Sequence, residues 1–148
     1  MNKKKIDAFL AAPLLARFAT ASPETFQPHV VPVWYEWDGE TLWISSYEST
    51  RKIGELRANP RCAVVVDVAE SVDGVSAVVF EGEAELITAP REFVRDMALR
   101  IYTRYMGPEG VLAPDPQEWA NSPENLIVTL FLRKKHENLI EYLYNKRE

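Results

Sequence analysis

The feature that most constrains the fold is a hairpin predicted in the first third of the chain. Residues 29–37 are rich in aromatic and β-branched side chains, Asp38-Gly39 is a strong turn signal, and residues 41–46 supply the return strand. Pro32 lies inside the first strand and has no N–H to donate to a ladder. Its position predicts a sheet edge, a bulge or a place where pairing is left open.

The other apolar runs extend this antiparallel pattern. We expect further strands over residues 14–21, 62–68, 75–88, 126–132 and, more weakly, 139–144. The sequence predicts helices over residues 4–12, 49–58 and 90–106. The strand–helix alternation of a doubly wound sheet is missing. Six or seven mostly antiparallel strands with three inserted helices therefore indicate a mainly β fold, an antiparallel barrel decorated by helices.

Residues 107–124 stand apart from this pattern. They contain four of the ten prolines and little periodicity, so we expect an irregular segment with one helical turn near Trp119. We suspect that this segment covers a binding cleft or wraps a partner subunit. No internal repeat and no linker divides the chain, so residues 1–148 are expected to form a single domain.

Composition excludes several classes of function. With 47% hydrophobic residues the chain can form a core, and its net charge of −5 disfavours binding to nucleic acid. No apolar run approaches the roughly 20 residues that span a bilayer. Lys3-Lys4-Lys5 is not followed by the apolar core of a secretory signal, and the single Cys62 excludes an internal disulfide. We therefore expect a cytoplasmic protein with no membrane segment and a buried, inert thiol.

The segment 45–52 carries the strongest chemical signal. Two serines, Ser45 and Ser46, end a predicted strand, and a short loop leads to a hydroxyl-capped helix that begins with Arg51 and Lys52. Because side chains alternate along a strand, only one of the two serine hydroxyls can face a given ligand. Hydroxyl donors, backbone N–H groups and two cations at one point are suited to a phosphate group. The plain alternative is a polar loop before a solvated helix.

Other kinds of site receive less support. His29 and His136 are the only histidines, and their surroundings do not predict a metal site. A structural hydrogen bond is the simpler interpretation of His29. Ser, His and Asp occur without nucleophile-elbow spacing, and a Gly-rich dinucleotide fingerprint is missing. The aromatic residues of the hairpin suit a core or a subunit interface, or the wall of a planar ligand site: Trp34, Tyr35, Trp37 and Trp43.

Four segments follow one another in a set order along the chain: residues 17–20 (Arg-Phe-Ala-Thr), 28–35, 46–61 and 80–84. The third contains Ser46, Thr50, Arg51 and Lys52, followed by Leu56 and Asn59-Pro60-Arg61. In this order and spacing the chain resembles the pyridoxamine 5′-phosphate oxidase-like family of FMN-binding split barrels. The resemblance covers roughly residues 6 to 105 of this sequence.

The resemblance implies a split β-barrel that forms a homodimer, with FMN bound in clefts made by both subunits. Carried onto this sequence, it implies a cofactor site made of Val31, Pro32, Val33 and Trp34 along the flavin, with Ser45, Ser46, Thr50, Arg51 and Lys52 at the phosphate. Because the turn is one residue longer than in the oxidases, either Ser49 or Thr50 could supply the second hydroxyl.

The function that follows is an FMN-dependent oxidoreductase acting on an unassigned small molecule, with the flavin performing the electron transfer. The oxidases' C-terminal Trp and Arg substrate elements are not found, so the vitamin B6 reaction itself is not expected. Three alternatives stay open: a split barrel that binds F420, one that binds haem, and a non-catalytic flavin-binding or sensor protein.

Overall fold

The computed structural model describes residues 3–131 together with residues 139 and 140. Its elements, in chain order, are α1 (Lys3–Ala11), β1 (Ala16–Ala21), β2 (Pro28–Val33), β3 (Tyr35–Trp37), β4 (Thr41–Tyr47), α2 (Arg51–Ala58), β5 (Arg61–Val72), β6 (Val75–Glu83), β7 (Glu85–Ile87), α3 (Arg91–Gly110), α4 (Pro114–Asn121), β8 (Asn125–Phe131) and β9 (Leu139–Ile140). The last strand predicted from the sequence, residues 139–144, is described only at its first two residues.

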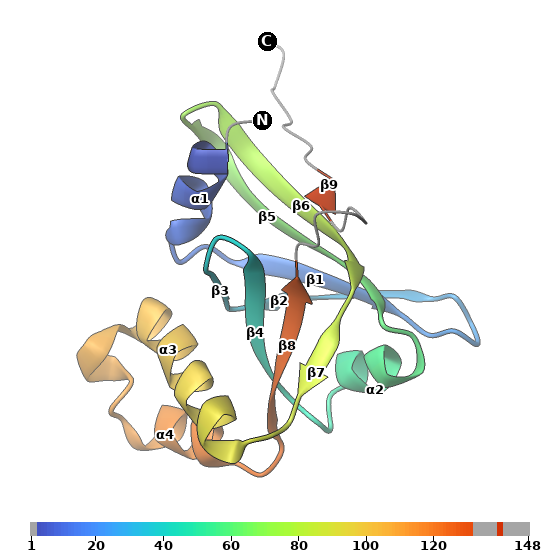
Figure 1. The fold of residues 1–148 in the computed structure, drawn as a ribbon, viewed down its shortest axis with the longest axis vertical. Helices are drawn as coiled ribbons and strands as arrows, with labels where there is room; N and C mark the ends of the chain where they lie inside the picture. Colours follow the sequence, from blue (N-terminus) through green and yellow to red (C-terminus); the bar gives the residue numbers. More distant parts are fainter. Residues whose placement is uncertain (1–2, 132–138, 141–148) are drawn as a thin grey trace.

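The strands form two antiparallel sheets that face each other across one core (Figure 1). The larger sheet has the order β2-β1-β5-β6-β9, and the smaller has the order β3-β4-β8-β7. Inward-facing side chains of both sheets fill the space between them, among them Phe18, Leu42, Ile44, Val64, Phe80 and Leu130. The predicted mainly β, split-barrel architecture is confirmed, and its ladders form two sheets without closing into one continuous barrel.

The described residues form nine strands, whereas the sequence predicted six or seven, because two predicted strands are each divided. Residues 29–37 divide at Trp34: β2 pairs with β1, and β3 pairs with β4. Residues 75–88 divide at Ala84 in the same way, between β6 on β5 and β7 on β8. At both points the extended chain leaves one sheet and enters the other. Pro32 lies on β2, an edge strand, which is one of the three positions that the sequence allowed.

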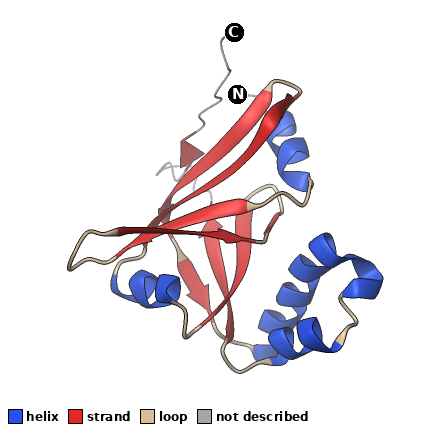
Figure 2. Ribbon diagram, turned by 180° about the vertical axis from the view of Figure 1, so that it is seen from behind, coloured by secondary structure: helices blue, strands red, loops and turns tan. Residues whose placement is uncertain are grey.

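Helices pack on strands of both sheets. α3 packs on β4 and β8, α4 packs on α3 and β8, α2 packs on β1, and α1 packs on β3 and β6. In the view from behind, β1 and β2 lie nearest the viewer, and no helix lies over them (Figure 2). Among the described residues, no helix is both long enough and apolar enough to traverse a bilayer.

The predicted helix over residues 90–106 is confirmed, and the segment after it is more regular than expected. α3 is interrupted at Gly107, which has φ 80° and ψ 166°, and α4 then forms eight helical residues where one turn was predicted. Pro114 suits the start of α4, since the first helical N–H has no intrahelical acceptor. Pro116 and Ala120 are buried, so packing holds a helix that periodicity did not reveal.

Candidate functional site

The two serines at the end of β4 point to opposite faces, as the alternation predicted. Ser45 lies on the face covered by helices: its hydroxyl is 3.2 Å from the Tyr102 hydroxyl and donates to Asn125 Oδ1 at 3.0 Å. Ser46 lies on the inward face and is only 6% exposed. Its Oγ is buried without a hydrogen-bond partner among the described residues. Of the pair, Ser46 therefore has the unused hydroxyl.

The loop after β4 leads into α2, and the first backbone N–H groups of this helix are unused donors. Thr50 is the N-cap residue, but its Oγ1 donates to the Tyr47 carbonyl at 2.7 Å and caps no helical N–H. The first backbone N–H groups of α2, those of Arg51, Lys52 and Ile53, have no acceptor in the described part of the chain. Such N–H groups carry the partial positive charge of a helix N-terminus. This is a suitable environment for an anion.

The first two residues of α2, Arg51 and Lys52, add two cations to these unused donors. The exposed Arg51 donates from Nε to Glu55 Oε1 at 3.3 Å, and its terminal nitrogens have no acceptor within residues 3–131. Lys52 is half-buried, and burial lowers the pKa of its ammonium group. No acidic side chain pairs with Lys52 in the part of the chain that the structure describes. An anion at this turn would supply what both side chains lack.

Sequence reasoning missed Glu55, which is 8% exposed and faces β1. Its Oε1 accepts from Thr20 Oγ1 at 3.3 Å as well as from Arg51 Nε. Its Oε2 is buried and has no hydrogen-bond partner among the described residues. The available signal was the spacing of four residues between Arg51 and Glu55, which brings the two side chains together on a helix.

The residues predicted along a flavin lie at the edge of the larger sheet. Val31 and Val33 face the core, whereas Pro32 is exposed on the outer face. Trp34 lies in the connection between β2 and β3, where its ring stacks on Tyr105 with centroids 4.7 Å apart and meets Tyr102 edge-on at 6.1 Å. Since Ser45 also contacts Tyr102, the structure brings Trp34 and Ser45 together around one ring.

The pairing between β3 and β4 ends next to Trp34 and Ser45. The β3–β4 register stops at Tyr35↔Ile44, although β4 continues to Tyr47, because the preceding chain turns away to pair with β1 as β2. Backbone groups of residues 45–47 on that side, and the outer edge of β2, therefore have no ladder partner among the described strands. No described hydrogen bond or ion pair joins residues 31–33 to Arg51 or Lys52.

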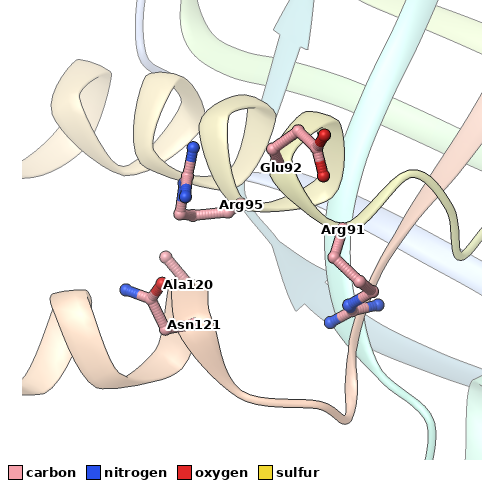
Figure 3. Close-up of a pocket in the computed structure, with 5 residues that line it drawn as sticks. All are labelled: Arg91, Glu92, Arg95, Ala120 and Asn121. Carbon is pink, nitrogen blue, oxygen red and sulfur yellow. The ribbon is translucent and has the colours of Figure 1, made fainter.

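A cavity of about 170 Å³ lies elsewhere, between α3 and α4, and is lined by Arg91, Glu92, Arg95, Ala120 and Asn121 (Figure 3). The two arginines of this cavity already have hydrogen-bond acceptors within the protein. Arg91 donates to three backbone carbonyls, those of Thr88, Ser122 and Asn125, at 2.8–3.0 Å. Arg95 pairs with Asp96 at 2.9 Å. The bonds of Arg91 fasten α3 to the chain that follows α4. The α2 turn, whose cations have unused donors, is the better candidate for a ligand site.

Comparison with protein families agrees with the fold. The family model described as pyridoxamine 5′-phosphate oxidase matches residues 3–129. The chain belongs to this family. The matched residues include the whole of the α2 turn and the β2 edge. Membership of the pyridoxamine 5′-phosphate oxidase family, expected from four short segments, is thus confirmed over most of the chain.

Solved structures resemble this protein over most of its length. A conserved hypothetical protein from Mycobacterium tuberculosis is 25% identical with a TM-score of 0.70, over 90% of this chain and 82% of that one. A protein described as an F420 reductase is 25% identical with a TM-score of 0.66, over 84% and 90%. A protein from Mycobacterium smegmatis described as binding FAD and haem is 19% identical with a TM-score of 0.64, over 90% and 68%, and supports the fold alone. Comparison with curated protein sequences gives no match.

Proposed function

We propose that this protein is an FMN-binding oxidoreductase that acts as a homodimer on a small-molecule substrate. The observation that carries the proposal is the concentration of unused donors at the β4–α2 turn. They are the Ser46 hydroxyl, the first N–H groups of α2, the terminal nitrogens of Arg51 and the Lys52 ammonium group. Hydroxyl, backbone N–H, guanidinium and ammonium groups are the kinds of donor that a phosphate monoester accepts from.

The residues present fit FMN in two parts. Ser46, Arg51 and Lys52 would hold the phosphate, with the hydroxyl of either Thr50 or the exposed Ser49 as a further contact. The ring would lie along Ser45, on the side of β4 away from β8, and along the β2 edge, the segment Val31, Pro32, Val33 and Trp34. When bound, the flavin supplies the electron transfer, so the protein needs only to bind it, orient it and limit access of water.

The proposed partner is a second copy of the chain, bound on the outer face of the larger sheet. This face has small or β-branched side chains at its centre, with Val30 61% exposed and Ala19, Ala63, Val65 and Val79 half-buried. An ion pair between Arg17 and Asp67 crosses the same face. No described helix covers it (Figure 2). An apolar patch with a few charges is typical of a subunit interface, and in a two-fold arrangement Arg17 of each copy could meet Asp67 of the other.

Light scattering tests this interface. Val65→Lys should convert a dimer into a monomer, whereas Leu112→Lys, which adds the same charge at a 71% exposed position between α3 and α4, should leave the dimer intact. A wild-type protein that is monomeric at every concentration examined would contradict the proposal of a homodimer.

The visible spectrum of the purified protein and an FMN titration test the cofactor. We expect a yellow protein with nearly stoichiometric flavin. Replacing Arg51 and Lys52 together by Ala removes two charge-assisted contacts, which should weaken FMN binding on the order of 100-fold or more. The control, Lys4→Ala with Lys5→Ala, removes the same charge from the exposed face of α1. Unchanged affinity of the Arg51 and Lys52 variant would refute the site.

F420 is the second candidate cofactor, because a protein described as an F420 reductase is 25% identical to this chain. Parallel titrations with FMN, F420 and haem separate the three possibilities. Reduction of the bound flavin by NADH or NADPH, followed by reoxidation, would distinguish an enzyme from a non-catalytic flavin-binding protein. A cytoplasmic location, expected from the sequence, belongs to this proposal.

A further inference from the structure

We propose that Glu55 is a positioning residue, which holds the guanidinium group of Arg51 ready for a phosphate. The inference rests on the proposed function, since it concerns how the anion site is kept in order. It assigns a role to a buried carboxylate that does not itself touch the cofactor.

The geometry of Arg51 is the first step. A guanidinium group binds phosphate best through two parallel N–H donors. The Nε donor of Arg51 is taken by Glu55 Oε1 at 3.3 Å, whereas its two terminal nitrogens have no acceptor among the described residues. Glu55 therefore occupies the inner edge of the group and leaves the terminal nitrogens for a ligand. Without this contact, the exposed and flexible Arg51 side chain would lose more conformational freedom on binding.

The anchoring of Glu55 is the second step. The Thr20 hydroxyl on β1 donates to Oε1 at 3.3 Å, and α2 packs directly on β1. Glu55 is 8% exposed, so its carboxylate is fixed by the sheet and shielded by the helix. A continuous chain of contacts thus runs from β1 through Thr20 and Glu55 to Arg51. Through these contacts the sheet sets the orientation of the cation.

The unused oxygen of Glu55 is the third step. Oε2 is buried without a hydrogen-bond partner in the described part of the chain. Burying a carboxylate oxygen in this way costs free energy, and an apolar side chain of similar size would avoid the cost. Packing alone therefore does not account for a glutamate here. A role in holding Arg51 does account for it.

The ion pair of Glu36 with Arg100 resembles that of Glu55 with Arg51 and serves as its control. Glu36 on β3 is also 8% exposed, accepts from Arg100 Nε at 2.8 Å, and has a buried Oε2 without a described partner. The difference is location, since Arg100 lies in the middle of α3 and Arg51 begins α2. Substitutions at Glu36 therefore make the same chemical change as substitutions at Glu55, but at a place away from the proposed anion site.

Charge must be separated from hydrogen bonding, because a carboxylate near a phosphate also repels it. Glu55→Gln and Glu55→Ala both remove the negative charge, but only Gln keeps an oxygen that can accept from Arg51 Nε. The ratio of the FMN affinities of these two variants, set against the same ratio for riboflavin, therefore reports the loss of the side-chain contact at constant charge. Riboflavin, which lacks the phosphate, reports any general damage to the flavin site.

The experiment measures FMN and riboflavin dissociation constants by flavin fluorescence for the wild type, the two Glu55 variants, Glu36→Gln and Glu36→Ala. The conformational freedom that a long side chain such as Arg51 loses when it is ordered corresponds to roughly a 3- to 10-fold change in affinity, so Glu55→Gln should bind FMN that much more tightly than Glu55→Ala. Riboflavin should bind equally to both. The two Glu36 variants should not differ for either ligand.

Equal FMN affinities of Glu55→Gln and Glu55→Ala, with a wild type that binds FMN, would overturn the positioning role and leave the proposed function intact. A wild type that binds neither flavin would instead refute the proposed function and the inference with it. Should Glu55→Ala fail to fold, Thr20→Val and Thr20→Ser give the same comparison one contact further away. Only Ser keeps the hydroxyl, so it should retain the FMN affinity that Val loses.

Discussion

The hydroxyl of Tyr105 on α3 accepts the backbone N–H of Tyr35 on β3 at 3.1 Å. The same hydroxyl donates to the Leu14 carbonyl at 2.7 Å, and the Tyr105 ring stacks on Trp34. Arg104, the preceding residue of α3, donates to the Tyr35 carbonyl at 3.0 Å. A helix thus satisfies both backbone groups of the residue at which the chain has just changed sheets. These contacts stabilise the point where β2 and β3 separate.

Tyr105→Phe should lower the free energy of unfolding by about 1–3 kcal/mol, because it leaves the N–H of the fully buried Tyr35 without a partner. The stacking on Trp34 is retained in this variant. Urea denaturation measures the loss. Thr103→Val is the control and should cost less, because the hydroxyl it removes donates, within the described residues, to the Leu99 carbonyl of the same helix. Equal losses in the two variants would show that the Tyr105 hydroxyl has no special role.

Burial lowers the pKa of Lys52 from its ordinary value of 10.5, which makes stability depend on pH in a predictable direction. Between the lowered pKa and 10.5 the folded protein binds fewer protons at this site than the unfolded chain, so the site favours folding more as pH rises. In protein freed of bound flavin, whose binding would itself stabilise the wild type, Lys52→Met should therefore be more stable than the wild type at pH 7, and the difference should shrink towards pH 10. Urea denaturation at both pH values measures it.

The control for Lys52 is Lys5→Met, at an exposed position of α1, whose effect on stability should not vary with pH in this way. A Lys52→Met effect that is the same at pH 7 and pH 10 would show that the ammonium group is not desolvated in the folded protein.

Patterns local in sequence were predicted well. The Asp38-Gly39 turn, the helix ending before Gly107 and the opposite orientation of Ser45 and Ser46 all depend on residues a few positions apart. The divisions at Trp34 and Ala84 could not be predicted, because a strand that passes between sheets keeps the same extended backbone and the same alternation. What changes there is the neighbouring strand, and pairing between distant segments decides that.

The candidate site shows the same division. Its cations follow directly from Arg51-Lys52 at a helix start, which the structure confirms as the beginning of α2. Its surroundings do not follow, because the partners of Ser45 lie 57 and 80 residues away, at Tyr102 and Asn125. Glu55 is a charged residue in a short helix, which the sequence alone indicates to be solvated. Only packing on β1 makes it a buried acceptor.

The Cys62 thiol should be unreactive in the folded protein. It packs against the core at the start of β5, and burial raises the pKa of the Cys62 thiol to about 12. Since the thiolate is the nucleophile, iodoacetamide at pH 8 should label native protein far more slowly than urea-unfolded protein. Mass spectrometry measures both rates. Native labelling as fast as that of the unfolded chain would contradict this prediction.

The raised pKa of Cys62 also has a consequence for alkaline stability. The folded state favours the protonated thiol, so its contribution is complete below the unfolded value near 9 and is lost as pH rises towards 12. Cys62→Ala should therefore lose less stability between pH 8 and pH 10.5 than the wild type does. Urea denaturation at the two pH values measures the difference, and identical losses would contradict the assignment.

Two glycines should respond in opposite ways to replacement by Ala. Gly107 has φ 80° and ψ 166°, a backbone conformation that residues other than glycine rarely adopt. Gly107→Ala should therefore destabilise the protein by about 1–3 kcal/mol. Gly54 lies within α2, and an added Cβ would meet no atom within 4 Å. Gly54→Ala should stabilise by about 0.5–1 kcal/mol, because glycine is a poor helix former. Thermal and urea unfolding of the two variants against wild type measure both effects, and a loss of stability in Gly54→Ala would show that this glycine is required for a close approach by another group.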